Sequence, residues 1–510
     1  MLKTMASFPQ TSPPCPGLSR RAAFRSVLGL AAAPAVLRGA RRPAGDKPNL
    51  LFLWTDEQRA DTMAVYGNYR FRVPVMNALA ARSIVFDQAY DTQPVCTPAR
   101  SSVMTGLYPH QNGLITNNIP LRPDTQTFPE LLGDGAYRTG YFGKWHLGDE
   151  LFAQHGFQEW ISIEDIYNQH FTAGRDRSKR SDYHHFLLRL GYQPDSKQGT
   201  FSREYAVGRP LEHCKPAFLA GHASDFILRH RNEPWMLYVN FLEPHMPFSG
   251  PLNDLHSEEE APIPRNYPGI PVEREPRSYA AIREQQKKGG INPGYLKLGP
   301  AATERAAVAR LNRNYAGLCS QVDQALGRIL WTLEASGQAD NTIIVFTTDH
   351  GDMMGAHTLV AKSVMYEEAV RVPLLISVPW RQRGRIKVER PVSQIDLAPT
   401  LLELMGRKAP EGLAGESLLP LVTGGKLREE DVFIEWNDRQ GPSARAVVTP
   451  DGWKMAVYDT DNSLLFHRER DPLEMENLYY RKDYAATVQR LRAKIEAWQQ
   501  RTGDKLRLPG

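Results

Sequence analysis

The sequence predicts an α/β fold: a large, mostly parallel sheet flanked by helices, followed by a smaller C-terminal antiparallel sheet. Over most of the chain, continuous apolar runs of strand length alternate with helical stretches, which is typical of a parallel sheet with helices on both faces. From about residue 431, short strand-like runs separated by Asp, Gly and Pro replace that alternation. We therefore expect a main domain at 47–430 and a small domain at 431–510.

Four apolar runs are predicted to form buried parallel strands, because strands covered on both faces have continuous apolar sequence. They lie at 49–54, 235–241, 342–347 and 373–378. Helical stretches are expected at 75–82, 128–134, 302–336 and 396–405. Residues 249–300 and much of 171–215 are instead rich in Pro, Gly and charge, and long irregular segments of this kind are usually functional or mobile.

The small C-terminal domain is predicted to contain three short strands and a closing helix. The strands are expected at 432–436, 445–448 and 453–458, and a polar helix at about 483–501. Turn residues between short strands favour antiparallel pairing over the crossovers that parallel strands need.

The first 42 residues are expected to be an export leader. They carry seven of the 62 basic residues and none of the 57 acidic ones, so the net charge of +5 becomes −2 without them. This balance gives no support to nucleic-acid binding. Arg20 and Arg21 precede a short apolar run at 27–33, which resembles a twin-arginine signal for export to the periplasm or medium. Since no other apolar run approaches the roughly 20 residues of a membrane span, we expect no spanning helix.

The sequence Cys-Thr-Pro-Ala-Arg at 96–100 lies after a strand-like run and ahead of a helix-like one. Pro98 suits the first helical position. That would place Cys96 by a helix N-terminus, where the partial positive charge favours an anionic substrate. Taken alone, the pattern also fits a buried cysteine before an ordinary helix.

Three polar residues closely follow predicted strands. They are Asp56, His245 and Asp349. Ligands of open parallel sheets collect beyond the carboxyl ends of the strands, so we expect these side chains to form one site. The two carboxylates suit a hard divalent cation that prefers oxygen ligands.

Seven sequence motifs together resemble the sulfatases, the formylglycine-dependent sulfuric ester hydrolases of the alkaline phosphatase superfamily. They occur in family order and at family-like spacings, at 55–59, 96–100, 143–148, 243–248, 348–352, Lys362 with 366–368, and 468–478. The resemblance therefore covers nearly the whole chain after the leader.

The resemblance implies that Cys96 is oxidised to formylglycine by a formylglycine-generating enzyme. One hydroxyl of the aldehyde hydrate attacks sulfur, and the other expels sulfate as the carbonyl reforms, whereas Cys or Ser would leave a stable adduct. Arg100 is expected to hold the hydrate, and Lys144 and Lys362 to clamp the sulfate oxygens. His146 would orient or deprotonate the hydrate, and His245 would protonate the leaving alcohol.

The resemblance also implies a metal shell made by Asp56, the converted Cys96, Asp349 and His350. Glu57 stands where Asp is commoner, so whether it is a ligand stays open. His350 stands where many sulfatases have Asn, as in the branch with choline sulfatases and phosphonate monoester hydrolases. Ca²⁺ is expected, and Mn²⁺ remains an alternative because imidazole suits transition metals better.

Hydrolysis of sulfate esters is thus the predicted function, with glycan sulfates favoured because long loops would border the pocket. A phosphonate or phosphate ester hydrolase is the alternative, since phosphoryl transfer needs the same metal and cationic clamp. An inactive glycan-binding relative is less consistent with the intact polar positions. No motif supports His184, His185 or His213, and we expect these three histidines to be packed or on the surface. Cys214 and Cys319 are expected to be free buried thiols, with a disulfide left open.

Overall fold

The computed structural model describes residues 47–257, 259–269, 272–288 and 305–509. The expected leader at 1–42 and the first residues of the helix expected at 302–336 lie outside these residues.

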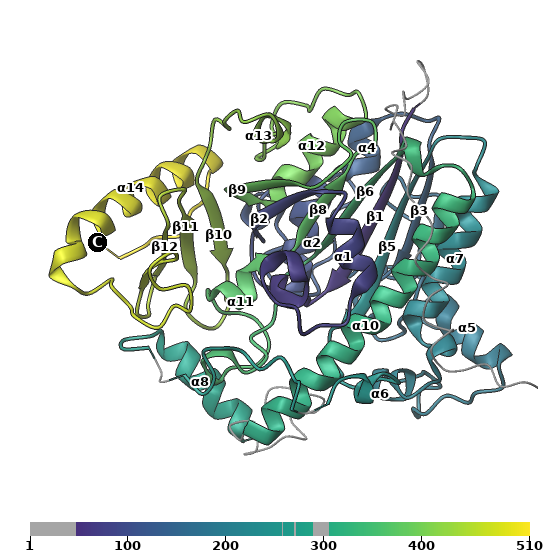
Figure 1. Cartoon of the computed structure of the whole chain (residues 1–510), viewed down its shortest axis with the longest axis horizontal. Helices are drawn as coiled ribbons and strands as arrows, with labels where there is room; N and C mark the ends of the chain where they lie inside the picture. Colours follow the sequence, from purple (N-terminus) through teal and green to yellow (C-terminus); the bar gives the residue numbers. More distant parts are fainter. Residues whose placement is uncertain (1–46, 258, 270–271, 289–304, 510) are drawn as a thin grey trace, which may run out of the picture. The chain divides into compact units, whose positions relative to one another are not determined.

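A nine-stranded mixed sheet runs through the main part of the chain (Figure 1). In spatial order its strands are β4 (Glu159–Ile161), β3 (Arg138–Gly143), β5 (Trp235–Pro244), β1 (Asn49–Asp56), β6 (Thr342–Thr348), β8 (Leu374–Ser377), β2 (Ile84–Tyr90) and β7 (Arg371–Val372), and β9 (Ile386–Ser393) also pairs with β2. Strands β4, β3, β5, β1 and β6 form a continuous parallel block, and β9 is parallel to β2.

Three of the four predicted strands are the central neighbours β5, β1 and β6, which are parallel as expected. The fourth, β8, is antiparallel to both β6 and β2, so the parallel direction predicted for 373–378 was wrong. A strand buried on both faces is apolar in either direction, and apolar sequence therefore carries no information about direction.

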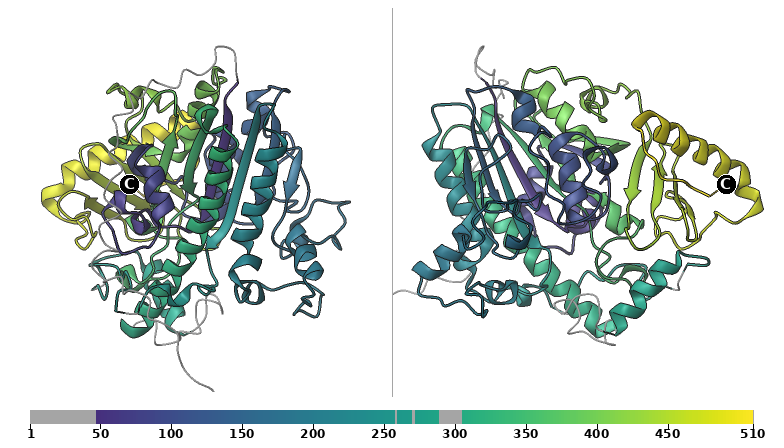
Figure 2. Two further views of the ribbon diagram at one scale, coloured as in Figure 1. Left: turned by 45° about the vertical axis from the view of Figure 1, so that its right-hand side comes forward. Right: turned by 180° about the vertical axis from the view of Figure 1, so that it is seen from behind.

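The side chains of β1 pack alternately into two hydrophobic cores, one on each face of the sheet. Leu51 and Leu53 pack in one core with helices α1, α7 and α10, whereas Leu50, Phe52 and Trp54 pack in the other with α2, α4 and α12. Successive side chains of a strand point to opposite faces, so a sheet covered on both sides needs apolar residues at every position. Figure 2 shows helices on both sides of the sheet.

The helices on these two faces agree largely with the prediction. Their bounds are α1 (Pro74–Ala80), α7 (Lys215–Arg229) and α10 (Arg305–Ala335) on one face, and α2 (Cys96–Thr105), α4 (Phe128–Leu132) and α12 (Leu397–Leu404) on the other. Only α7 had no predicted counterpart. The segments expected to be irregular contain α5 (Asp182–Arg189), α6 (Arg203–Val207) and α8 (Arg277–Lys287), and further short helices are α3 (Pro109–Asn112), α11 (Glu367–Val370) and α13 (Leu419–Val422).

A four-stranded antiparallel sheet follows near the C-terminus, as predicted. It comprises β10 (Val432–Trp436), β11 (Ala444–Val448), β12 (Trp453–Tyr458) and β13 (Leu464–His467), of which only β13 was not predicted. Helix α14 (Ala485–Thr502) covers one face of this sheet with Leu491, Ile495 and Trp498. The opposite face packs on residues around α11, including Met365 and Tyr366.

The parallel block delivers polar residues to one edge of the sheet. Asp56 ends β1, His245 directly follows β5, and Asp349 directly follows β6. Among the described helices, none combines the length and hydrophobicity needed to cross a membrane.

Candidate active site

Cys96 is the first residue of α2. The backbone N–H of Ala99 donates to the carbonyl of Val95 at 3.1 Å, so Val95 is the N-cap and Pro98 is the third helical residue, not the first as predicted. Proline is tolerated there because the first N–H groups of a helix have no partner within it. Cys96 therefore lies at a helix N-terminus, as expected. The helix begins two residues earlier than the position of Pro98 predicted.

Four side chains converge around Cys96. The ligand atoms of Asp56, Cys96, Asp349 and His350 all lie within 4.8 Å of one another, and all four residues are buried. The Cys96 Sγ lies 3.3 Å from His350 Nε2 and 3.8 Å from Asp56 Oδ1. These are the residues predicted to form the metal shell, and the structure brings them together.

His350 is oriented for ligation by its neighbour. Its Nδ1 lies 2.9 Å from the carbonyl of Gly351, and because a carbonyl only accepts, Nδ1 carries the proton and Nε2 faces the group with its lone pair. A Cβ atom on Gly351 would lie 2.0 Å from the carbonyl of Glu368, so only glycine fits. Asp349 Oδ1 accepts from the N–H groups of His350 and Glu57, at 2.9 and 3.1 Å.

This donor set fits a divalent cation. Two carboxylates and one imidazole nitrogen supply the oxygen and nitrogen ligands that Ca²⁺ or Mn²⁺ accept. Burial alone would raise the pKa of Asp56, but the positive charges of Lys144 and Arg100 hold it well below its usual value, so this carboxylate is ionised. Burial, followed by the charge of Asp56, raises the pKa of the Cys96 thiol to about 11, so the unmodified side chain is not a thiolate.

Arg100 contacts both carboxylates of the group around Cys96. Its Nε donates to Asp349 Oδ2 at 2.9 Å and its Nη2 to Asp56 Oδ2 at 2.9 Å, while Nη1 donates to the carbonyl of Lys144 at 3.0 Å. The guanidinium is fully buried and lies 4.8 Å from the ring centroid of Trp54. Its contacts therefore position the carboxylates, and the predicted contact with a modified Cys96 is an additional role that stays a prediction.

The two predicted sulfate-binding lysines contact different carboxylates at this site. Lys144 Nζ is 2.6 Å from Asp56 Oδ2 and 3.8 Å from Cys96 Sγ. Lys362 Nζ is 3.0 Å from Glu57 Oε1. For both lysines burial would lower the pKa, but the surrounding negative charges raise it above the usual value, so both are cationic.

The two predicted catalytic histidines also lie at this site. His146 Nε2 contacts Asn118 Oδ1 at 2.9 Å, and its ring packs on Tyr167 with centroids 4.6 Å apart. His245 Nδ1 contacts the carbonyl of Met246 at 2.9 Å, while Nε2 lies 3.5 Å from Glu57 Oε2 and 4.0 Å from Asp56 Oδ1. Burial, and then a nearby lysine, lowers the pKa of both imidazoles well below the usual value, so both are neutral in this state.

Glu57 belongs to a second, overlapping group. Its carboxylate groups with the carboxylate of Asp56 and the imidazole of His245 rather than with Cys96 and His350. Burial raises its pKa to about 7, against the opposing charge of Lys362. Its role as a metal ligand therefore remains open, and in this structure its carboxylate forms an ion pair with Lys362.

A cavity of about 380 Å³ opens onto Cys96. Its walls include Lys144, His146, His245 and Lys362, which the sequence predicted. The walls that the sequence did not predict include Asn117, Asn118, Tyr167, Arg203 and Gln286. Arg203 and Gln286 come from the two Pro- and Gly-rich segments that were expected to be functional or mobile, but no motif marks these particular residues. Among the described residues that line this cavity, none is acidic.

The three histidines and the two cysteines that no motif supports lie elsewhere, as expected. His184 is buried against Asp165 at 2.8 Å, His213 contacts the hydroxyl of Tyr192 at 2.9 Å, and His185 is exposed. None of the three lines the cavity at Cys96. Cys214 and Cys319 are free buried thiols.

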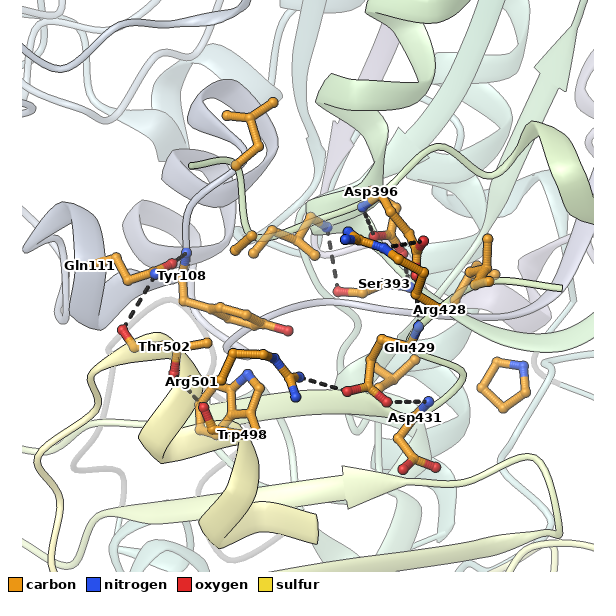
Figure 3. Close-up of a pocket in the computed structure, with 18 of the residues that line it drawn as sticks. Tyr108, Gln111, Ser393, Asp396, Arg428, Glu429, Asp431, Trp498, Arg501 and Thr502 are labelled. Carbon is orange, nitrogen blue, oxygen red and sulfur yellow. Dashed lines mark hydrogen bonds and ion pairs between the residues drawn. The ribbon is translucent and has the colours of Figure 1, made fainter. Parts of the chain in front are cut away.

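A second cavity, of about 390 Å³, lies between α14 and the segments around 391–396 and 412–432 (Figure 3). Its charged side chains are paired within the protein: Arg501 contacts Glu429 at 2.6 Å, and Asp396 accepts from the N–H of Glu416 at 2.9 Å. Among its described lining residues there is no cysteine and no lysine, so the cavity at Cys96 is the candidate active site.

The comparisons with known proteins agree with this site. The model of the sulfatase family matches residues 48–407, which include every predicted active-site residue. The chain belongs to the sulfatase family. A model of the C-terminal region of N-sulphoglucosamine sulphohydrolase also matches residues 355–501 of this sulfatase.

This sulfatase has relatives along most of its length. It is 30% identical over 449 residues to the uncharacterized sulfatase YidJ of Escherichia coli, covering 85% of this chain and 83% of that protein. It is 26% identical over 501 residues to the N-acetylglucosamine-6-O-sulfatase of Bacteroides thetaiotaomicron, covering 90% and 87%. The family and these relatives identify the sulfatase as a sulfuric ester hydrolase.

Solved structures share its fold. A phosphonate monoester hydrolase from Silicibacter pomeroyi aligns with a TM-score of 0.75 at 23% sequence identity, over 89% of this sulfatase and 96% of that chain. At this identity the likeness establishes the sulfatase-like fold and leaves the reaction to be argued from the site.

Proposed function

We propose that this sulfatase hydrolyses sulfate esters of glycans with a formylglycine made from Cys96 and a divalent metal ion. The observation that supports this most strongly is the position of Cys96. Its Sγ faces the cavity at a helix N-terminus, 3.3 Å from a ligating nitrogen of His350 and 3.8 Å from the ammonium of Lys144. Few structural roles would surround a buried cysteine with two carboxylates, an imidazole and a lysine.

The metal ion and the formylglycine would each have a defined place and a defined chemistry at this site. Asp56, Asp349, His350 and the converted Cys96 would hold the metal, which polarises a sulfate oxygen and lowers the pKa of a bound hydroxyl. The hydrate of formylglycine would supply one hydroxyl as the nucleophile and a second whose deprotonation releases sulfate. We also propose that a formylglycine-generating enzyme makes this conversion, and that the leader exports the protein.

The chain's own residues bind the sulfate and move protons. Lys144 and Lys362, which both line the cavity at Cys96, neutralise the sulfate oxygens, while Arg100 keeps the carboxylates of Asp56 and Asp349 in place. His146, held by Asn118 and Tyr167, orients or deprotonates the nucleophilic hydroxyl. His245 presents Nε2 to the cavity, because its Nδ1 is held by a main-chain carbonyl. It is neutral in the free enzyme, so it takes up a proton at Nε2 from solvent when the anionic ester binds and then donates that proton to the leaving oxygen.

The experiment that tests this proposal is mass spectrometry of the peptide containing Cys96, from protein made in a host with the modifying enzyme. We expect the aldehyde in active protein. Cys96→Ser should release at most one product per site, because a serine ester has no second hydroxyl to expel sulfate. Cys214→Ser is the matched control, since the Cys214 thiol donates to the carbonyl of Arg209 at 3.3 Å and a hydroxyl can replace it. Full activity with an unmodified Cys96 thiol would refute the mechanism.

A phosphonate or phosphate ester hydrolase is the second candidate. It is supported by the same cationic clamp and by the shared fold of the Silicibacter phosphonate monoester hydrolase, while the relative from Bacteroides is named for a sulfated sugar. Parallel assays with an aryl sulfate and the matching aryl phosphonate monoester separate the two. A higher kcat/KM for the sulfate supports our proposal, and the reverse order favours the alternative.

A further inference from the structure

The cavity at Cys96 has one cation more than a single sulfate ester needs. Lys144 and Lys362 both lie beside Cys96 or its neighbours, whereas Arg203 lines the cavity from the start of α6. Because no acidic residue is among the described residues that line this cavity, its walls favour anions on more than one side.

Arg203 is held in one orientation by a carboxylate behind it. Its Nε and Nη2 donate to the two oxygens of Glu164 at 2.6 and 2.5 Å, and Nη2 also donates to the Tyr167 hydroxyl at 3.0 Å. Its Nη1 has no hydrogen-bond acceptor among the residues that the structure describes, and 17% of the side chain is exposed. The guanidinium is therefore fixed, and it keeps one nitrogen without a protein acceptor at a residue that lines the cavity.

The charge around Arg203 is not fully balanced. Glu164 is shared with Lys215, whose Nζ lies 2.9 Å from Oε1, so one carboxylate faces two cations. Glu243 and Asp56 are further buried carboxylates that act on this group. Burial raises the pKa of Glu243 to about 7, so at neutral pH it offsets the excess only in part, and Asp56 is already paired with Lys144 and Arg100. A purely structural ion pair would not need both cations.

Arg203 lies beside the reaction centre rather than at it. Tyr167 connects them, because its hydroxyl accepts from Arg203 while its ring packs on His146 at 4.6 Å. An anion on Nη1 would therefore lie on the Tyr167 side of the cavity, separate from the sulfate held between Lys144 and Lys362.

We propose that Arg203 binds a second anionic group of the substrate, so that the enzyme prefers sugars carrying a further sulfate or a carboxylate besides the sulfate that is cleaved. This rests on the proposed hydrolysis of glycan sulfates and adds a substrate class to it. A guanidinium recognises the planar carboxylate or the sulfate oxygens by charge-assisted hydrogen bonds. Arg203 acts in specificity and takes no part in the chemical step.

The test compares wild-type enzyme with Arg203→Gln and Arg203→Lys. Arg175→Gln is the matched control, because Arg175 pairs with Asp149 at 3.1 Å and does not line the cavity. Each protein is assayed with 4-nitrophenyl sulfate, and competition is measured with N-acetylglucosamine 6-sulfate, glucosamine 2-N,6-O-disulfate and glucuronic acid 2-sulfate. The disulfate tests whether Arg203 binds a second sulfate, and the glucuronic acid 2-sulfate tests whether it binds a carboxylate.

We expect the wild-type enzyme to bind at least one sugar with two anions about tenfold or more tightly than the monosulfate. Arg203→Gln should abolish this preference and leave turnover of 4-nitrophenyl sulfate within about threefold, since that substrate does not reach Arg203. Arg203→Lys should retain part of the preference, because the positive charge remains but the planar set of guanidinium N–H donors is lost.

Absence of the preference in wild-type enzyme, or its persistence in Arg203→Gln, would overturn the proposal. So would an equal loss for all four compounds together with a lower Tm, which indicates a structural ion pair. If the wild-type enzyme hydrolyses no sulfate ester, the proposed function fails. Calorimetric titration of the three sugars into wild-type and Arg203→Gln protein then still decides whether Arg203 selects a second anion.

Discussion

At the scale of single residues, Arg100 illustrates how much of the site depends on atoms that do not touch substrate. One guanidinium contacts Asp56, Asp349 and the main chain of Lys144, all at 2.9–3.0 Å. The ligand oxygens of Asp56 and Asp349 lie within 4.8 Å of each other. Two buried carboxylates this close would repel each other without a cation between them. Lysine could supply the charge but not the planar fork that reaches both carboxylates. Arg100 thus preorganises the two carboxylates for the proposed metal ion.

His245 is the residue whose role can be separated most clearly by kinetics. Proton donation matters when the leaving alcohol is poor, and general acid catalysis typically contributes about 10²–10⁴-fold. His245→Ala should therefore slow hydrolysis of alkyl or sugar sulfates by about that factor while scarcely changing hydrolysis of 4-nitrophenyl sulfate. The measurement is kcat/KM for both substrate types.

His213→Ala serves as the control for this experiment, because His213 contacts Tyr192 and lies outside the cavity. Equal losses on both substrate types for His245→Ala would assign His245 to sulfate binding, with Lys362 as the next candidate for the acid. Unchanged kinetics with a lower Tm would leave His245 a packing role only.

At the scale of elements, a buried charge cluster joins the C-terminal sheet to the loop that carries Lys362. Lys454 of β12 lies 3.0 Å from Glu367 Oε1 and 2.5 Å from Glu474 Oε1. Glu474 Oε2 in turn accepts from the backbone N–H of Glu367, the first residue of α11, at 2.8 Å. The tail motif at 468–478 therefore contributes a carboxylate that ties β12 to α11, five residues after Lys362.

Removing the cation from this cluster should be costly. Lys454→Met leaves two buried carboxylates without their partner, and breaking a buried pair on one side typically costs about 3–5 kcal/mol. We expect the free energy of unfolding, measured by urea denaturation, to fall by about that amount.

Lys387→Met is the matched control, because Lys387 pairs at the surface with Glu389 at 3.0 Å and its side chain is 44% exposed. Such surface pairs contribute at most about 1 kcal/mol. A loss for Lys454→Met no greater than that of the control would contradict the structural role assigned to this cluster.

At the scale of the whole molecule, the proposed metal ion would connect segments that are far apart in the chain. Asp56 ends β1, Cys96 begins α2, and Asp349 and His350 follow β6. A ligand that binds only the folded state stabilises it, by about 2.7 kcal/mol when its concentration is 100 times Kd. Removing the metal with a chelator should therefore lower Tm and abolish turnover, and Ca²⁺ or Mn²⁺ should restore both.

His350→Asn refines this prediction, because it replaces an imidazole by an oxygen ligand. The variant should shift the metal preference from Mn²⁺ toward Ca²⁺. The preference is measured by comparing the rise in Tm that each metal causes. An identical Tm with and without metal, or full turnover in rigorously metal-free enzyme, would refute the assignment of Asp56 and Asp349 as ligands.

Several features followed from the sequence because they depend on local pattern. The strands β1, β5 and β6 are continuous apolar runs, since both faces of the sheet are covered. The carboxyl ends of parallel strands meet at one edge of a sheet, so the strand pattern by itself predicted that Asp56, His245 and Asp349 lie together. The resemblance to the sulfatases, which those local motifs carry, added Lys144, His146, His350 and Lys362.

Other features were decided only by the tertiary structure, because they depend on pairs of groups brought together from distant segments. The direction of β8, the carboxylates that Arg100 contacts and the placement of Arg203 beside Tyr167 all have no local signature. Arg203 lies 107 residues from Cys96 in a segment marked only by its irregular composition. A local pattern determines which residues can act, whereas packing across the sheet edge decides which of them share a cavity.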